Sequence, residues 1–245
     1  MNREEVIKKY FTEIGLDINY LNLYFVRRSI LQALESNLHK FKGKLLDVGC
    51  GIMPYRELIL NHNKNVVSYI GLDFESSIDK EYSLGKPDLF WTGDIIPVAD
   101  SSIDTIIATE FFEHCPYPEK IMAEMLRVLK PGGVLFFTVP FLWNLHVVPY
   151  DEYRYTPFSL QRHLLTAGFI NIDLKALGGI DASLAQMMAI WYRHRPMRSL
   201  YKKYLSSLFI TVIKRLIKSD SKVDKGQLFT EGSMVTGLSG TAYKK

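Results

Sequence analysis

Short apolar runs alternate with segments of helical periodicity along most of the chain. Apolar runs of about four to eight residues, bounded by turn residues, are typical of buried strands. They predict six strands, over residues 44–48, 66–73, 88–91, 102–109, 134–140 and 169–177, and a last strand near the end of the chain. Because helical signals separate most of these runs, we expect an α/β fold with a parallel, doubly wound sheet.

Proline and glycine mark where the intervening helices begin and end. The predicted helices cover about residues 54–61, 118–130 and 156–167, and each has a proline in its first turn. Gly168 suits a C-terminal cap, and Pro131-Gly132-Gly133 stops the middle helix. The pattern divides the chain into an N-terminal helical segment (1–43), a core (44–175), a helical insertion (176–230) and a C-terminal strand of the core sheet (231–245).

Composition narrows the class of protein. The chain has 245 residues, of which 47% are hydrophobic, yet it contains no uninterrupted apolar stretch of the length that a spanning helix needs. Its first residues are charged and lack the apolar core of a secretory signal, and two cysteines make no disulfide framework. We therefore expect a cytoplasmic protein.

The predicted insertion is strongly basic. Residues 176–230 carry 10 Lys and Arg against 3 Asp and Glu, and apolar residues recur at helical spacing over 200–218. This segment suits peripheral contact with an anionic membrane, docking on a partner, or packing on its own domain. We expect no nucleic-acid binding, because no nucleic-acid motif accompanies the charge.

Polar and glycine residues follow five successive predicted strands. They are Gly49 and Gly51, Asp73, Asp94, the segment 110–115 (EFFEHC) and the segment 146–155 (HVVPYDEYRY). Ligands of parallel sheets bind at the carboxyl ends of the strands, so we expect these residues to converge on one rim.

The loop after the first strand, LLDVGCGIMPY, has two glycines but no third glycine where a dinucleotide loop has one. Met53 and Pro54 occupy that position, and Asp47 would repel a diphosphate. A carboxylate beside a bare backbone instead favours a ligand with an ammonium group. Cys50, between the two glycines, is a further candidate contact for this ligand, and it has no neighbouring base to make it a nucleophile.

Further along the rim, acidic residues are spaced to recognise the rest of such a ligand. Asp73 is placed to accept hydrogen bonds from a ribose diol, Asp94 from an adenine amino group, and Ile95 to pack on the adenine ring. Phe74 is a further candidate contact. An ammonium group, a ribose and an adenine together describe S-adenosylmethionine.

The segments LLDVGCGIMPY, YIGLDFE, GDIIPVADSSIDTIIATEFFEHCPYPEKIMAEMLRVLKPGGVLFFTVPF and GTAYKK resemble the class I S-adenosylmethionine-dependent methyltransferases of the type 11-like group. The resemblance implies a Rossmann-like seven-stranded sheet of order 3-2-1-4-5-7-6 with the last strand antiparallel. It also implies cofactor roles for Gly49, Gly51, Asp73 and Asp94. The segment HVVPYDEYRYTP resembles members associated with glycan or secondary-metabolite pathways, and Met53-Pro54 departs from the family pattern.

Methyl transfer by in-line displacement requires alignment and, for a hydroxyl acceptor, a base. His146 is the first candidate for this base and His114 the second, because neutral imidazole suits the task near pH 7. Asp151 is the third candidate. Glu110 is expected to line the cofactor pocket. Tyr153, Arg154 and Tyr155 are expected to contact a small-molecule or glycan acceptor, with packing on the sheet and an Asp151–Arg154 pair as the structural alternative.

Two other classes of function stay open. A nicotinamide-dependent oxidoreductase also uses a glycine loop and a later acidic residue, and a methyltransferase fold can serve as a non-catalytic binding scaffold. We expect no metal site, because the sequence has no C-x-x-C pair or H-E-x-x-H spacing.

Overall fold

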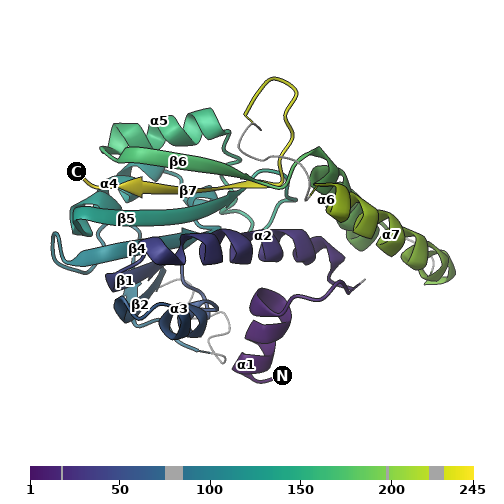
Figure 1. The fold of residues 1–245 in the computed structure, drawn as a ribbon, viewed down its shortest axis with the longest axis horizontal. Helices are drawn as coiled ribbons and strands as arrows, with labels where there is room; N and C mark the ends of the chain where they lie inside the picture. Colours follow the sequence, from purple (N-terminus) through teal and green to yellow (C-terminus); the bar gives the residue numbers. More distant parts are fainter. Residues whose placement is uncertain (18, 75–84, 197–198, 221–228) are drawn as a thin grey trace.

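The computed structural model describes residues 1–17, 19–74, 85–196, 199–220 and 229–245. In these residues seven strands form one sheet of order β3-β2-β1-β4-β5-β7-β6 (Figure 1). The strands are β1 (Gly43–Val48), β2 (Val66–Phe74), β3 (Leu89–Trp91), β4 (Ile103–Thr109), β5 (Leu129–Pro140), β6 (Ile170–Leu177) and β7 (Gly237–Tyr243). Strands β1 to β5 pair in parallel, and β7 runs antiparallel to β5 and β6. The expected sheet order and the direction of the last strand are confirmed.

Helices cover both faces of the sheet. On one face, α4 (Pro118–Val128) and α5 (Pro157–Ala167) bury Met125 and Leu164 in a cluster with strand residues. On the other, α2 (Leu21–Asn37) and α3 (Arg56–His62) bury Ile30 and Ile59. Apolar burial on both faces explains why β4 and the second half of β5 are largely continuous apolar runs, whereas the edge strand β6 alternates.

Two boundaries differ from the sequence prediction. Helix α3 begins at Arg56 rather than near Pro54, because Pro54 and Tyr55 form a turn that the N–H of Arg56 closes by donating to the carbonyl of Met53 at 3.4 Å. Strand β5 begins earlier than predicted, at Leu129, which pairs with Ile103. Pro131-Gly132-Gly133 therefore lies within the strand, where the pairing with β4 is irregular, and not at the end of the helix.

The N-terminal segment and the insertion pack against each other. The chain begins with α1 (Arg3–Ile7) and a π-helical turn (Lys8–Thr12), and the insertion forms α6 (Ile180–His194) and α7 (Ser199–Asp220), which project past the end of β6 (Figure 1). Leu21 and Phe25 of α2 share a buried cluster with Ala185 of α6 and Ile213 of α7.

Part of the predicted apolar stripe at 200–218 is therefore covered by its own chain, whereas Tyr204 and Leu208 stay exposed. Contact of this exposed part with a membrane or partner stays a prediction. None of the helices in the described ranges combines the length and apolarity needed to cross a bilayer.

Candidate functional site

The loop after β1 is shaped by two glycines in the left-handed region. Gly49 has a φ of +72° and Gly51 a φ of +50°, and the N–H of Gly49 donates to the carbonyl of Leu72 at 2.9 Å. A Cβ atom on Gly49 would lie 2.4 Å from the ring of Phe111, whereas one on Gly51 would meet nothing within 4 Å. Gly49 is thus needed for packing inside the protein, and Gly51 presents bare backbone to open space.

Asp73, at the end of β2, holds this loop in place. Its Oδ2 atom accepts a hydrogen bond from the N–H of Gly51 at 2.9 Å, and its Oδ1 atom accepts one from Phe74 at 2.8 Å. Each carboxylate oxygen keeps a second acceptor position. The predicted ribose contact is therefore compatible with the contacts that Asp73 already makes.

Asp47 lies buried in the neighbouring strand, and the hydroxyl of Tyr69 on β2 donates a hydrogen bond to it. Burial raises the pKa of Asp47 to about 7, and the charge of Asp73 adds to this effect, although the bond from Tyr69 opposes it. A cation nearby would favour the charged form of Asp47. Tyr69 was not among the predicted site residues, although it lies on the parallel strand adjacent to Asp47.

Aromatic rings line the rim beside the loop. Phe74 stacks on Trp91 with 5.5 Å between ring centroids and on Phe111 with 5.9 Å. Asp94 and Ile95 are exposed, Ile95 at 69%, so their predicted adenine contacts stay predictions.

Two residues of the loop face the interior. Cys50 is buried, and burial with the neighbouring aspartates raises the pKa of its thiol far above the usual range, so it is no nucleophile. The Met53 side chain is buried against Gly71, where a Cβ atom would approach its sulfur within 2.6 Å. The departure from the family pattern at Met53 is thus accommodated by a glycine on β2.

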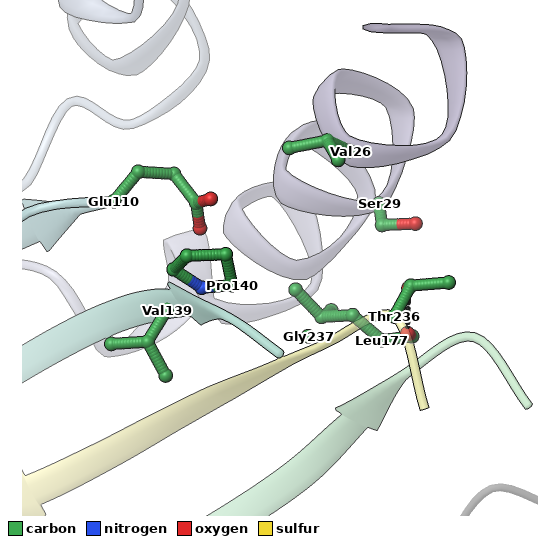
Figure 2. A pocket seen from close by; sticks show the side chains of 8 residues that line it. All are labelled: Val26, Ser29, Glu110, Val139, Pro140, Leu177, Thr236 and Gly237. Atoms are coloured by element: carbon green, nitrogen blue, oxygen red, sulfur yellow. Dashed lines mark hydrogen bonds between the residues drawn. The ribbon is translucent and has the colours of Figure 1, made fainter. Parts of the chain in front are cut away.

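The residue after β4, Glu110, has a φ of +51°, and its N–H donates to the carbonyl of Thr138 at 3.0 Å. Burial raises the pKa of its carboxyl above the ordinary value. Figure 2 shows this carboxyl above Pro140 and facing α2, at a small open pocket. The pocket is lined by Val26, Ser29, Glu110, Val139, Pro140, Leu177, Thr236 and Gly237. Glu110 thus lines a pocket at the carboxyl ends of β4 and β5, and its predicted contact with a cofactor stays a prediction.

The structure brings the two predicted base candidates together. The rings of His114 and His146 have centroids 4.8 Å apart, and the Nε2 atoms lie 3.7 and 3.9 Å from Oε1 of Glu113. Nδ1 of His114 is 2.8 Å from the carbonyl oxygen of Tyr150, and Nδ1 of His146 is 3.3 Å from Oδ2 of Asp151. Burial lowers the pKa of His146, which favours a neutral ring. Glu113 was not among our predicted site residues, although it precedes His114 directly.

Asp151 is bound by Arg154 through both guanidinium nitrogens, at 2.7 and 2.8 Å. Burial would raise the pKa of Asp151, but the bonds from Arg154 and the N–H of His146 outweigh it and hold the pKa at about 2. With these contacts Asp151 is suited to orient the ring of His146, and its low pKa makes it a poor base for the acceptor. Arg154 also donates to two backbone carbonyls, so its guanidinium is bound within the loop, as in the structural alternative.

Tyr155 corrects one of our predictions. Its side chain is 2% exposed, and its hydroxyl donates to the carbonyl of Phe112 at 3.0 Å, so it is a core residue rather than a substrate contact. Tyr153 stacks on it with 5.3 Å between centroids and stays partly exposed. Only Tyr153 of the two keeps a surface that an acceptor can reach.

Comparison with known proteins gives matches in sequence and in fold. Residues 46–137 match the family described as "Methyltransferase domain". Sterol 24-C-methyltransferase erg6 of Schizosaccharomyces pombe is 37% identical over 98 residues, which are 37% of this chain and 26% of that protein. The match thus spans only about a quarter of the length of the fungal sterol methyltransferases.

Solved structures share the fold at low identity. A SAM-dependent methyltransferase from Archaeoglobus fulgidus superposes with a TM-score of 0.54 at 15% identity, over 88% of this chain and 94% of that one. An S-adenosylmethionine-dependent methyltransferase from Mesorhizobium loti gives 0.54 at 14% identity, over 88% and 98%.

Proposed function

We propose that this chain, which carries a class I S-adenosylmethionine-dependent methyltransferase domain as the sequence resemblance predicted, transfers a methyl group from S-adenosylmethionine to a small-molecule acceptor. The observation that carries the proposal is the arrangement of Asp47, Gly51 and Asp73. A bare backbone loop is tied to one carboxylate and lies beside a second, buried one. This arrangement offers a site to a cationic amino-acid tail and a ribose. The N–H groups of Gly49 and Gly51 already donate to Leu72 and Asp73, so the loop does not offer them to a diphosphate.

Within that site, the ammonium group is assigned to Asp47, the ribose to Asp73, and the adenine to Phe74, Asp94 and Ile95. The backbone from Gly49 to Gly51 then borders the methionine portion. Because the cationic sulfonium is already reactive, the protein's main task is to hold donor and acceptor in line.

The acceptor is assigned to the side of Glu110 and the histidine pair. Val139 and Leu177 give apolar surface beside the Glu110 carboxyl there, the mixture of apolar and polar groups that a small molecule with a polar group would contact. The relatives named for a sterol support a small-molecule acceptor. A hydroxyl, including one on a glycan, is our preferred acceptor group. Nε2 of His146 or His114 would receive its proton in the absence of a metal ion.

Calorimetric titration of the full chain with S-adenosylmethionine and with NAD tests the proposal. We expect saturable binding of S-adenosylmethionine and none of NAD; the reverse result would favour the oxidoreductase alternative. Incubation with a radiolabelled methyl donor and fractionated small molecules then identifies the acceptor. Cofactor binding without transfer to any fraction would favour a scaffold.

A further inference from the structure

Two loops that follow neighbouring strands are joined into one unit. The 3-10 turn η5 (Phe112–His114) follows β4, and residues 141–156 follow β5. The carbonyl of Glu113 accepts hydrogen bonds from the N–H groups of Glu152 and Tyr153, at 2.8 and 3.1 Å. The side chains of Glu113, His114 and His146 therefore meet in a fixed frame.

Both imidazole rings are oriented by acceptors behind them. The carbonyl oxygen of Tyr150, 2.8 Å from Nδ1 of His114, accepts hydrogen bonds only. Oδ2 of Asp151, a carboxylate that also binds Arg154, lies 3.3 Å from Nδ1 of His146. With the protons on Nδ1, both neutral rings direct the lone pair of Nε2 towards Glu113.

Glu113 lacks the partners that a buried acid requires. Its side chain has no exposed surface, and neither carboxylate oxygen has a hydrogen-bond partner among the described residues. Its Oε1 atom is 3.7 and 3.9 Å from the two Nε2 atoms, which is beyond hydrogen-bond distance. Burying an acid without a hydrogen-bond partner costs free energy. A buried, unpartnered carboxylate that two imidazole lone pairs approach therefore points to a bound cation that is shared by the three side chains.

The spacing suits a metal ion. The three ligand atoms all lie within 4.8 Å of one another. Atoms bound to one ion at about 2.1 Å lie about 3.0–3.4 Å apart, so a shift of side-chain torsions closes the set. We propose that Glu113, His114 and His146 bind one divalent transition-metal ion, with Zn²⁺ as the ion that two imidazoles and a carboxylate suit best.

The surroundings match those of a reactive metal site rather than a purely structural one. Three protein ligands leave an open coordination position, and acceptors behind the histidines orient them as outer-shell partners do. The expectation of no metal relied on ligands close in sequence, whereas His146 reaches this cluster from the loop after another strand. If the proposed function holds, an acceptor hydroxyl at the open position would lose its proton more readily, and the histidines would act as ligands instead of bases.

Metal titration of the full chain tests this site without cofactor or acceptor, so its outcome is independent of the methyl-transfer experiment. Protein stripped with a chelator is titrated with Zn²⁺, and with Mg²⁺ for comparison. We expect one tight Zn²⁺ site, with affinity lowered at least tenfold by Glu113→Gln and by His146→Ala. His62→Ala is the matched control, because His62 lies on α3 and bonds to Leu58 of its own helix.

No Zn²⁺ binding, or equal binding by Glu113→Gln and the wild type, would overturn the proposal, as would tighter binding of Mg²⁺ than of Zn²⁺. Zinc-edge X-ray absorption of the wild-type protein needs no variant. We expect two imidazoles and oxygen donors, and sulfur ligation would equally reject the site. Thermal unfolding of each variant shows whether it is folded when titrated.

Discussion

The Oδ2 atom of Asp73 accepts a hydrogen bond from the backbone N–H of Gly51 at 2.9 Å, although 22 residues separate the two. This bond ties the loop after β1 to the end of β2, and Asp73 stays 8% exposed beside it. One carboxylate therefore both shapes the loop and faces the proposed ribose site.

Asp73→Ala is expected to weaken S-adenosylmethionine binding at least tenfold and to lower the free energy of unfolding by about 1–2 kcal/mol, because the loop N–H loses its partner. Calorimetry and urea unfolding measure the two effects. Asp173→Ala, on the far strand β6, is the control and should leave affinity unchanged. Wild-type affinity in Asp73→Ala would remove Asp73 from the cofactor site.

Gly51→Arg separates backbone strain from blocked binding. A side chain at Gly51 or at Gly132 meets open space, and both glycines have positive φ values, so each substitution should cost about 1–2 kcal/mol of stability. The matched control is Gly132→Arg. Only Gly51→Arg is expected to abolish cofactor binding, since Gly132 lies within β5 away from the rim. Equal affinity in the two variants would contradict the assignment of the loop.

Asp47 predicts a dependence of stability on pH. Its pKa of about 7 in the folded protein lies above the ordinary value of about 3.9, so the folded state keeps a proton that the unfolded state loses. The free energy of unfolding should therefore fall as pH rises from about 4 to 7, by about 4 kcal/mol at most. Asp47→Asn should flatten this slope in urea unfolding measured across the window, and an unchanged slope would argue against the raised pKa.

The same carboxyl predicts the pH dependence of binding. A cationic ligand favours ionised Asp47, so affinity for S-adenosylmethionine should rise with pH up to about 7, by at most about tenfold per unit. Calorimetry between pH 5 and 8 in buffers of different ionisation enthalpy should detect the released proton. Asp47→Asn should bind more weakly and without this pH dependence.

Tyr155→Phe tests whether this residue belongs to the core. The change leaves the buried carbonyl of Phe112 without its donor, and we expect a loss of about 1–3 kcal/mol. The matched variant Tyr153→Phe removes a bond to Pro116 at the surface and should cost about 1 kcal/mol or less. A larger loss for Tyr153 in thermal unfolding would reverse the assignment.

The sheet was predictable because its signals are local. Apolar runs give the strands, and Pro118, Pro157 and Gly168 fix the ends of α4 and α5 within a few residues. The strand order came from the family resemblance, since periodicity alone sets no order. Met53 shows the limit of a local signal, because nothing near it in the sequence indicated the left-handed backbone that it adopts.

The site was predictable only in part, because its contacts join residues far apart in sequence. The loop glycines and Asp73 were expected at one rim because each follows a parallel strand, and the structure joins Gly51 to Asp73 there, while their contact with a cofactor stays a prediction. The cluster of Glu113 with His146 depends on how the loop after β5 folds back, which no spacing in the chain encodes. In the same loop, nothing in the alternation of residues 151–155 indicated that Tyr155 turns inward.

The stacking of Trp91, the last residue of β3, with the rings of Phe74 and Phe111 gives the protein a built-in optical reporter. Trp91 is 3% exposed, and its indole lies directly behind the ring that we assign to adenine. An aromatic ligand arriving on Phe74 would change the emission of this buried indole, so cofactor occupancy can be followed by intrinsic fluorescence, with Trp91→Phe as the reference that keeps only the emission of Trp143 and Trp191.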